Sequence, residues 1–248
     1  MWLKGLAGVN FGFLGYVHPF HKIGTFGLGF MFLDAGRIIV NDEDEPEHNK
    51  ELKLQQDILF ILGYARNFGK LYSGINVKYV RSTLIEQYRA DVYALDWGLF
   101  YRTGLFKSIM KFESEGIDSG ISIQNIGGKI TYDRVGDELP LTVRGGFSYK
   151  VKMGTDHQGI FSADLVKPND SSLREHFGIE YLYKDMVAVR AGYRLGQDLG
   201  AISIGIGMVH KGLTFDYGLG FSEAMNNFHR ISFNLRFGVE REAPEVYF

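Results

Sequence analysis

Few residues in this sequence have the types and spacing that catalysis or metal binding requires. The seven histidines include one close pair, in His18-Pro19-Phe20-His21, which lies in a predicted turn with no cysteine or carboxylate beside it. A structural zinc site needs four ligands of these kinds, so two histidines satisfied within a turn or an interface are the favoured interpretation. The sequence has no cysteine, which removes disulfides, thiolate metal sites and cysteine nucleophiles together.

Glycine motifs that bind nucleotides are not found either. Gly127–Ile130 contains Gly-Gly-Lys but lacks the upstream glycine of a phosphate-binding loop, and Gly24–Gly29 lies in a strand pattern instead of a strand-to-helix turn. There is no Gly-x-Ser-x-Gly elbow, although a Ser-His-Asp set built from distant residues stays open as an alternative. The acidic run Asn41–His48 is interpreted as a solvated loop, with a calcium or partner site as the alternative.

Charged residues at alternate positions of extended segments are more informative. The closing segment His229–Gly238 places isoleucine, phenylalanine and leucine on one side of a strand, and arginine, serine and asparagine on the other. The charged residues on the polar side of such segments are Asp96, Arg102, Arg144, Lys150, Asp164, Glu180, Arg190, Arg194, Asp216, Arg230 and Arg236. We expect them to face the lumen of a barrel.

Charges of both signs on one face of a wall have two interpretations. In the structural one, acids and bases pair across strands, because an unpaired buried charge is very costly. In the functional one, these residues line a conduit and select what passes through it. A turn centred near Asp185 places Glu180 directly opposite Arg190, which favours structural pairing. The surplus of arginine nevertheless leaves room for an anionic ligand such as a carboxylate.

The elements that position these residues are about thirteen strands, because the same alternation runs through the whole chain. The expected strands are 6–18, 24–40, 52–66, 71–82, 91–102, 117–132, 140–152, 158–166, 175–184, 186–195, 201–210, 213–222 and 229–238. Most are near the length of about 9–11 residues with which a tilted strand crosses a membrane. The pattern predicts an all-β fold, a transmembrane antiparallel β-barrel that is apolar outside and polar inside, and 32 glycines and 15% aromatic residues suit such a wall.

Composition and charge exclude other classes of protein. A mean hydropathy of -0.08, with no apolar run of about 18 residues, excludes transmembrane helices. A net charge of -2 gives no basic footprint for nucleic acid. In a soluble β-sandwich the outward Tyr181, Tyr193 and Phe237 would form the core instead. The strand lengths, the lack of long crossovers and the charged second face favour the barrel.

Short and long connections alternate along the chain, as they do in outer-membrane barrels. The long polar connections Asn41–Lys50 and Tyr132–Leu139 are expected outside the cell. Counting back from a last strand that ends in the periplasm, we expect one strand before Met1 and fourteen in the full-length protein. The N-terminus shows no signal peptide, which agrees with truncation. The barrel then covers residues 1–238, with its first strand missing, and residues 239–248 form a tail.

Six blocks, in matching order and spacing across nearly the whole chain, resemble the PorV/PorQ family of outer-membrane proteins, relatives of the fatty-acid transporter FadL. They are Gly24–Phe30, Ala94–Tyr101, Ile123–Gly128, His176–Tyr181, Val189–Arg194 and His229–Phe233. The resemblance implies a FadL-like barrel of fourteen strands in the bacterial outer membrane. Family members also carry a signal peptide and a segment with an Asn-Pro-Ala-Gly-Leu-like motif, neither of which occurs in this sequence.

The resemblance implies two functions, and it carries over no catalytic residues, metal ligands or cofactor. Some members resemble the shuttle of the type IX secretion system, so the leading expectation is docking of exported cargo or secretion components through the extracellular loops. Others resemble FadL, so the competing expectation is transport of a hydrophobic small molecule. The expected partners are outer-membrane lipid, secreted cargo and such a ligand, but not nucleic acid. A barrel lipase is a third hypothesis.

Overall fold

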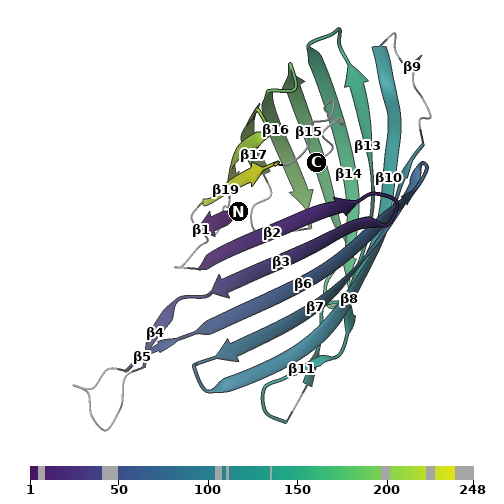
Figure 1. Cartoon of the computed structure of the whole chain (residues 1–248). Coiled ribbons are helices and arrows are strands. Elements are labelled where there is room, and N and C mark those ends of the chain that lie inside the picture. The colour runs from purple at the N-terminus through teal and green to yellow at the C-terminus, as the bar shows by residue number, and fades with distance from the viewer. Residues whose placement is uncertain are drawn as a thin grey trace.

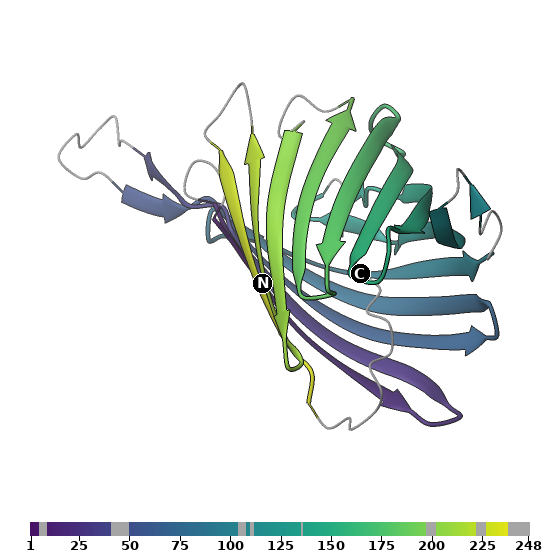
Figure 2. The same ribbon diagram turned by 90° about the horizontal axis from the view of Figure 1, so that it is seen from above.

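The protein forms one curved wall of β-strands joined by turns. The computed structural model describes residues 1–4, 9–40, 50–103, 108–109, 112–134, 136–196, 202–221 and 227–237. Strands β2 to β8 run across the view in Figure 1, whereas β13 to β16 stand steeply, and Figure 2 shows the curvature of the wall from above. Among the described residues, no helix has the length and apolar character needed to cross a membrane.

Thirteen long strands of the described residues form the wall, as the alternation of side chains predicted. They are β2 (Asn10–Phe20), β3 (Gly24–Asp34), β6 (Gln55–Phe68), β7 (Leu71–Leu84), β8 (Tyr88–Arg102), β10 (Phe112–Gly127), β13 (Thr142–Lys152), β14 (His157–Pro168), β15 (Arg174–Tyr183), β16 (Val187–Leu195), β17 (Ile202–His210), β18 (Leu213–Phe221) and β19 (Phe228–Leu235). The short strands are β1 (Trp2–Lys4), β4 (Arg37–Val40), β5 (Lys50–Lys53), β9 (Ser108–Ile109), β11 (Lys129–Thr131) and β12 (Gly136–Glu138).

The long strands follow one another around the wall in chain order, each antiparallel to its neighbours. This order results from tight turns, because a short connection can join only adjacent antiparallel strands. Between β17 and β18, Lys211 and Gly212 both have positive φ, at 47° and 82°. Two such residues form the hairpin turn whose twist matches that of the strands it joins.

A narrow seam lies between the first and last long strands. Strand β1 pairs there with both β2 and β19, so that the order of hydrogen-bonded strands returns to its start. It contributes only three residue pairs to each neighbour, from Trp2 to Lys4, and Met1 adds two backbone hydrogen bonds to Phe13. Beyond Phe13, the described residues supply no strand beside the outer edge of β2. In the described part of the chain, β2 and β19 are thus joined only beside Met1 and β1.

Two hairpins leave the wall at the same end of the barrel. The predicted strand 24–40 breaks at Ala35–Gly36, and its second part is β4, which pairs with β5 and extends beyond the wall (Figure 1). The predicted strand 117–132 likewise breaks at Gly128, and β11 pairs with β12. The predicted loop Tyr132–Leu139 therefore contains a strand. Glycine with φ of 84° at Gly36 permits the first bend.

The outer face of the wall is apolar and open to the surroundings. On β17, the outward residues Ile202, Ile204, Ile206 and Met208 are between 48% and 59% exposed, and they face large apolar residues of β18. The buried apolar residues of the described chain are few and small: Ala90, Val92, Ala94, Val151, Val166 and Ala188. This distribution reverses that of a soluble protein, which rarely exposes large contiguous apolar patches.

Aromatic side chains are spread over the outer face. On β8, Tyr93 and Tyr101 bound an outward row that is otherwise formed by Leu95, Trp97 and Leu99. The row covers a length near that of a tilted membrane-crossing strand. Tyrosine suits both ends of this row because the ring is apolar and the hydroxyl is polar.

Two predicted segments lie outside the described residues: the acidic run Asn41–His48, between β4 and β5, and the tail 239–248.

Candidate functional site

The inner face of the wall carries the side chains that alternate with the apolar outer ones. Cross-strand register assigns each residue to a face, because successive side chains of a strand point to opposite sides. By this register, nearly all of the predicted lumen-facing charges occupy inner positions: Asp96, Arg102, Arg144, Lys150, Asp164, Glu180, Arg190, Arg194, Asp216 and Arg230. The inner face is the candidate site.

Arg236 is the exception. The sequence pattern placed it in a strand ending at residue 238, but β19 ends at Leu235. The backbone N–H of Arg236 donates instead to the carbonyl oxygen of Gly212, at 2.8 Å, beside the turn between β17 and β18. The strand ends early because its partner strand β18 begins at Leu213, directly opposite Leu235. Arg236 therefore lies at the rim of the barrel, one residue beyond the end of β19, and its placement on the inner face stays a prediction.

Glycine occupies many inner positions and widens the space inside the wall. Six pairs of inner glycines in the described strands lie directly opposite each other: Gly15–Gly29, Gly27–Gly63, Gly74–Gly98, Gly120–Gly146, Gly178–Gly192 and Gly205–Gly218. Because glycine has no side chain, each pair leaves bare backbone facing the lumen. A cavity of about 660 Å³, here called the central cavity, is lined by residues of β2, β3, β6, β7, β8, β10, β13 and β14, among them six glycines, inner polar side chains and the rings of Tyr72 and Phe100.

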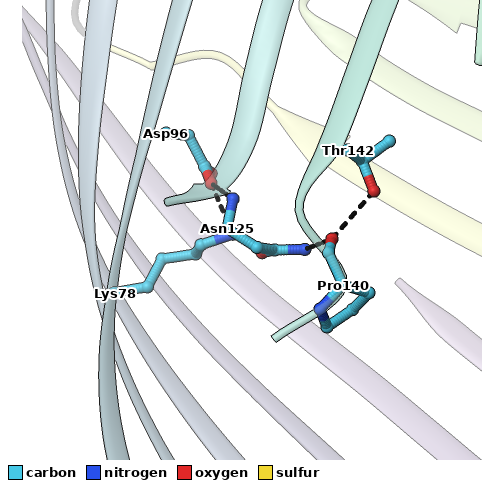
Figure 3. A network of polar contacts seen from close by, with 5 residues as sticks. All are labelled: Lys78, Asp96, Asn125, Pro140 and Thr142. Atoms are coloured by element: carbon cyan, nitrogen blue, oxygen red, sulfur yellow. Dashed lines mark hydrogen bonds and ion pairs between the residues drawn. The ribbon is translucent and has the colours of Figure 1, made fainter. Parts of the chain in front are cut away.

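One group of inner charges is tied together beside a bulge in β10 (Figure 3). Lys78 of β7 lies 2.6 Å from the carboxylate of Asp96 on β8 and donates to the side-chain oxygen of Asn125, at 2.5 Å. The backbone N–H of Asn125 donates to Asp96, at 2.9 Å, and its side-chain amide donates to the carbonyl oxygen of Pro140. The φ of Asn125 is 60°, a conformation that asparagine tolerates better than most residues.

This Asn125 network has a structural role. The register between β8 and β10 shifts between Ile123 and Ile126, so the bulged backbone would otherwise lose a hydrogen-bonding partner. Asp96 accepts the N–H at the bulge, and Lys78 balances the charge of Asp96. All three charged or polar groups are satisfied within the wall, as buried polar groups generally are.

A second group of inner charges joins three strands on the other half of the wall and crosses a fourth. Arg190 of β16 forms an ion pair with Glu180, directly opposite on β15, and a second with Asp216 of β18, at 2.6 Å. The arrangement spans β17 because Gly205 and Gly207 have no side chains to obstruct the guanidinium. The pairing of Glu180 with Arg190 predicted from the turn near Asp185 is confirmed.

A third group lies toward the end of the barrel that carries the long connections. His176 sits directly opposite Asp164 on one side and Arg194 on the other, and its Nε2 is buried without a hydrogen-bond partner among the described atoms. Arg194 lies over the ring of Phe228, at 5.9 Å. Arg230 donates through Nε to the sulfur of Met1, at 3.0 Å. Unlike Arg190, these arginines have no ion pair in the described part of the chain.

Arg102 lies at the opposite end of the lumen, where β8 ends. Its guanidinium carbon is 5.1 Å from the ring centroid of Tyr72 and 6.0 Å from that of Phe100. Both rings are on inner positions, so the cation rests on aromatic faces, which attract it electrostatically. Lys150, on β13, lies 3.9 Å from Asp118 of β10 and is buried.

Several inner residues were missed by the sequence reasoning, among them Lys78, Asp118, Asn125, Arg174 and His176. Lys78 and His176 alternate with apolar residues in the same way as the predicted charges, so the same rule would have found them. Asn125 carries no such signal, because the bulge that gives it its role changes the alternation itself. Within the described ranges, no group of three or more histidine, aspartate or glutamate residues is placed to hold a metal ion.

Neither the comparison with protein-family models nor that with curated proteins gives a match to this chain. Among solved structures, three mutant forms of the porin of Rhodopseudomonas blastica are similar, at 8–9% sequence identity. The alignments cover 92% of this chain and 90% of each porin, with TM-scores of 0.41, 0.38 and 0.40. Similarity at this level adds nothing to what the strand order and the two faces of the wall establish.

Proposed function

We propose that this protein spans the bacterial outer membrane as a β-barrel and lets small polar solutes pass through its lumen. The observation that carries the proposal is the contrast between the two faces of the wall. The outer face exposes large apolar side chains on one strand after another, while the inner face carries glycine, serine and charged residues around a cavity of about 660 Å³. Antiparallel barrels of this polarity suit a bilayer because they satisfy their backbone hydrogen bonds within the wall.

The lining favours polar over hydrophobic solutes. Six glycines line the central cavity, and Asn76, Asp96, Asp118, Ser122 and Arg144 supply its polar groups beside the rings of Tyr72 and Phe100. A binding site for a hydrophobic molecule is usually lined mostly by apolar and aromatic side chains. A FadL-like transporter of hydrophobic molecules is therefore the less favoured form of the transport hypothesis, and uptake of a fluorescent fatty acid by vesicles containing the barrel tests it.

Conductance across a planar lipid bilayer tests the proposal. A Cβ at Gly98 or Gly27 would meet no heavy atom closer than 3.8 Å, so Gly98→Phe, alone and combined with Gly27→Phe, should narrow the lumen without disturbing the wall. We expect the single-channel conductance to fall stepwise. The matched control is Gly145→Phe, whose side chain would project from the outer face and whose Cβ also has 3.8 Å of clearance.

Two outcomes would overturn the channel proposal. One is a wild-type barrel that inserts into the bilayer but carries no measurable current. The other is equal conductance of the wild type, the Gly98→Phe variant and the outward Gly145→Phe control. Labelling by a serine-reactive fluorophosphonate, followed by mapping of the labelled residue, would instead support the barrel lipase.

A second candidate function is docking of exported proteins or secretion components, as the resemblance to PorV/PorQ proteins implies. The observation that favours it is the β4–β5 hairpin, which extends beyond the wall (Figure 1) and is held by an ion pair between Arg37 and Glu51, at 3.1 Å. A paired hairpin that projects from the wall presents a surface to a partner. The β11–β12 hairpin leaves the same end.

Replacement of residues 37–53 by a two-residue Asn-Gly turn tests docking. The purified wild type should carry exported proteins that share a domain, identified by mass spectrometry, and the shortened variant should lose them while its conductance is retained. The matched control replaces the short turn Lys211–Gly212, at the opposite end of the barrel, by the same Asn-Gly turn. Identical co-purifying proteins in the wild type and the shortened variant would contradict the docking hypothesis.

A further inference from the structure

A bay on the inner face of β16 to β19 is lined by three arginines and by Asp216, over a floor of glycine. Its volume is about 660 Å³. Gly205 and Gly218 lie directly opposite each other, between Arg190 on one side and Arg230 on the other. The next inner positions toward the long connections are Gly192, Ser203 and Gly220, which extend the floor. Arg194 and Phe228 lie at its edge. We call this region the arginine bay.

The bay exists because the chain places the smallest residue at successive inner positions of β17 and β18. A Cβ at Gly218 would meet no heavy atom closer than 3.8 Å, so backbone crowding does not require glycine there. At Gly218 the floor is therefore bare although a side chain would fit, whereas a Cβ at Gly205 or Gly192 would lie within 3.2 Å of a neighbouring atom. A concave region with a few converging polar groups is where a ligand is expected to bind.

The three arginines of the bay differ in how their charge is balanced. Arg190 is held by Glu180 and Asp216, with 29% of its side chain exposed. Arg194 and Arg230 have no ion pair in the described part of the chain, and their contacts are the ring of Phe228 and the sulfur of Met1. Two carboxylates therefore balance the charge of Arg190, whereas no described carboxylate pairs with Arg194 or Arg230.

Nearby charges strengthen this imbalance. Toward the same end of the lumen lie Arg144, Arg174 and His176, with Asp164 as the inner carboxylate among them. Arg174 donates to the hydroxyl oxygen of Ser171, at 3.0 Å, and not to an acid. Among the described inner residues around the arginine bay, cationic side chains therefore outnumber carboxylates, and a positively charged site raises the local concentration of anions.

We propose that Arg194 and Arg230 bind an oxyanion, a carboxylate or a phosphate group, in the arginine bay. Guanidinium groups match these anions because two parallel N–H donors meet two oxygens. The hydroxyls of Ser203 and Ser232, which also line the bay, supply further donors, and Phe228 provides an apolar edge for the organic part of a ligand. The inference rests on the proposed function, since it names the class of solute that the lumen selects.

Isothermal titration of the detergent-solubilised barrel with inorganic phosphate tests the inference, with acetate as the second probe. The test variant combines Arg194→Gln with Arg230→Gln, and the matched control is Arg66→Gln, an exposed arginine on the outer face of β6. We expect the dissociation constant of at least one probe to rise about tenfold or more in the double variant, because charged hydrogen bonds are lost. Arg66→Gln should leave it unchanged. The probe that binds more tightly identifies the ligand as a phosphate or a carboxylate.

The binding measurement separates this inference from the channel proposal. Equal affinity for both probes in the wild type and the double variant, or no binding by the wild type, would overturn the oxyanion site even if the barrel conducts. A barrel that binds phosphate at these arginines but carries no current would refute the channel and leave the site. If the glutamine variant does not fold, Arg194→Lys with Arg230→Lys keeps the charge and loses the paired donors. A threefold or greater loss of affinity then supports the site, and a smaller change overturns it.

Discussion

The ion pairs of Arg190 give the most direct test of how the inner face stabilises the wall. Arg190→Met keeps a side chain of similar length and removes both charged hydrogen bonds, to Glu180 and to Asp216. The two carboxylates are then left on the inner face without a counter-charge. Their side chains are only 16% and 22% exposed, so water compensates them incompletely.

The expected loss of stability follows from these contacts. A hydrogen bond to a charged group contributes about 1.5–3 kcal/mol, and partial hydration favours the lower figure for each bond. We therefore expect Arg190→Met to lower the free energy of unfolding by about 3 kcal/mol. Replacing the acids as well, by Glu180→Gln and Asp216→Asn in the same chain, should recover most of this loss, because no uncompensated charge remains.

Equilibrium unfolding in urea of the barrel inserted in phospholipid vesicles, followed by tryptophan fluorescence, measures these differences. The matched control is Arg81→Met on the outer face, where Arg81 and Asp91 lie 2.7 Å apart and both side chains are 43% exposed. An exposed pair of this kind contributes up to about 1 kcal/mol. The reasoning fails if Arg190→Met costs no more than this control, or if the triple variant is as unstable as the single one.

Two further substitutions test the packing and the orientation of the wall. Gly146→Ala would place a Cβ 1.8 Å from a carboxylate oxygen of Asp164 and 2.8 Å from a backbone oxygen, so we expect the free energy of unfolding to fall by about 1–3 kcal/mol. The control Gly145→Ala, on the outer face, should change it by less than about 0.5 kcal/mol. Equal values for the two variants would contradict the register. Ile204→Arg on the outer face should lower the free energy of unfolding in vesicles by about 2–4 kcal/mol. Ser203→Arg, one residue away on the inner face, should lower it much less. A negligible effect at Ile204 would show that this face does not contact lipid.

The long strands were predictable from the sequence because one physical rule governs them. A wall with an apolar outside and a polar inside requires alternation along every strand, and segments such as Ile202–Met208 show it plainly. The pairing of Glu180 with Arg190 was predictable for a related reason. Once the turn near Asp185 is located, the register of the whole hairpin is determined.

The rest of the site depends on features that break the alternation. Asn125 lies at a bulge, where one extra residue shifts the register, so the pattern of apolar residues gives no indication of its contact with Asp96. The early end of β19 depends on the start of its partner strand at Leu213 and left Arg236 at the rim. The bridge from Arg190 to Asp216 crosses an intervening strand and depends on Gly207, which the local sequence of β16 does not reveal.

The seam at β1 has a consequence for the order in which the barrel assembles. Away from the seam, each long strand pairs with the long strand that is next to it in the chain. The contact across the seam instead joins Met1 to Arg230, 229 residues away. Closing a loop of that length costs about 3–4 kcal/mol more conformational entropy than closing a four-residue turn, and only three residue pairs on each side repay it. We therefore expect the hairpins to form first and the seam to close last. In hydrogen exchange, the amides of β1 and of its partners on β2 and β19 should lose protection before any other part of the wall, which makes this line the place where the barrel begins to unfold.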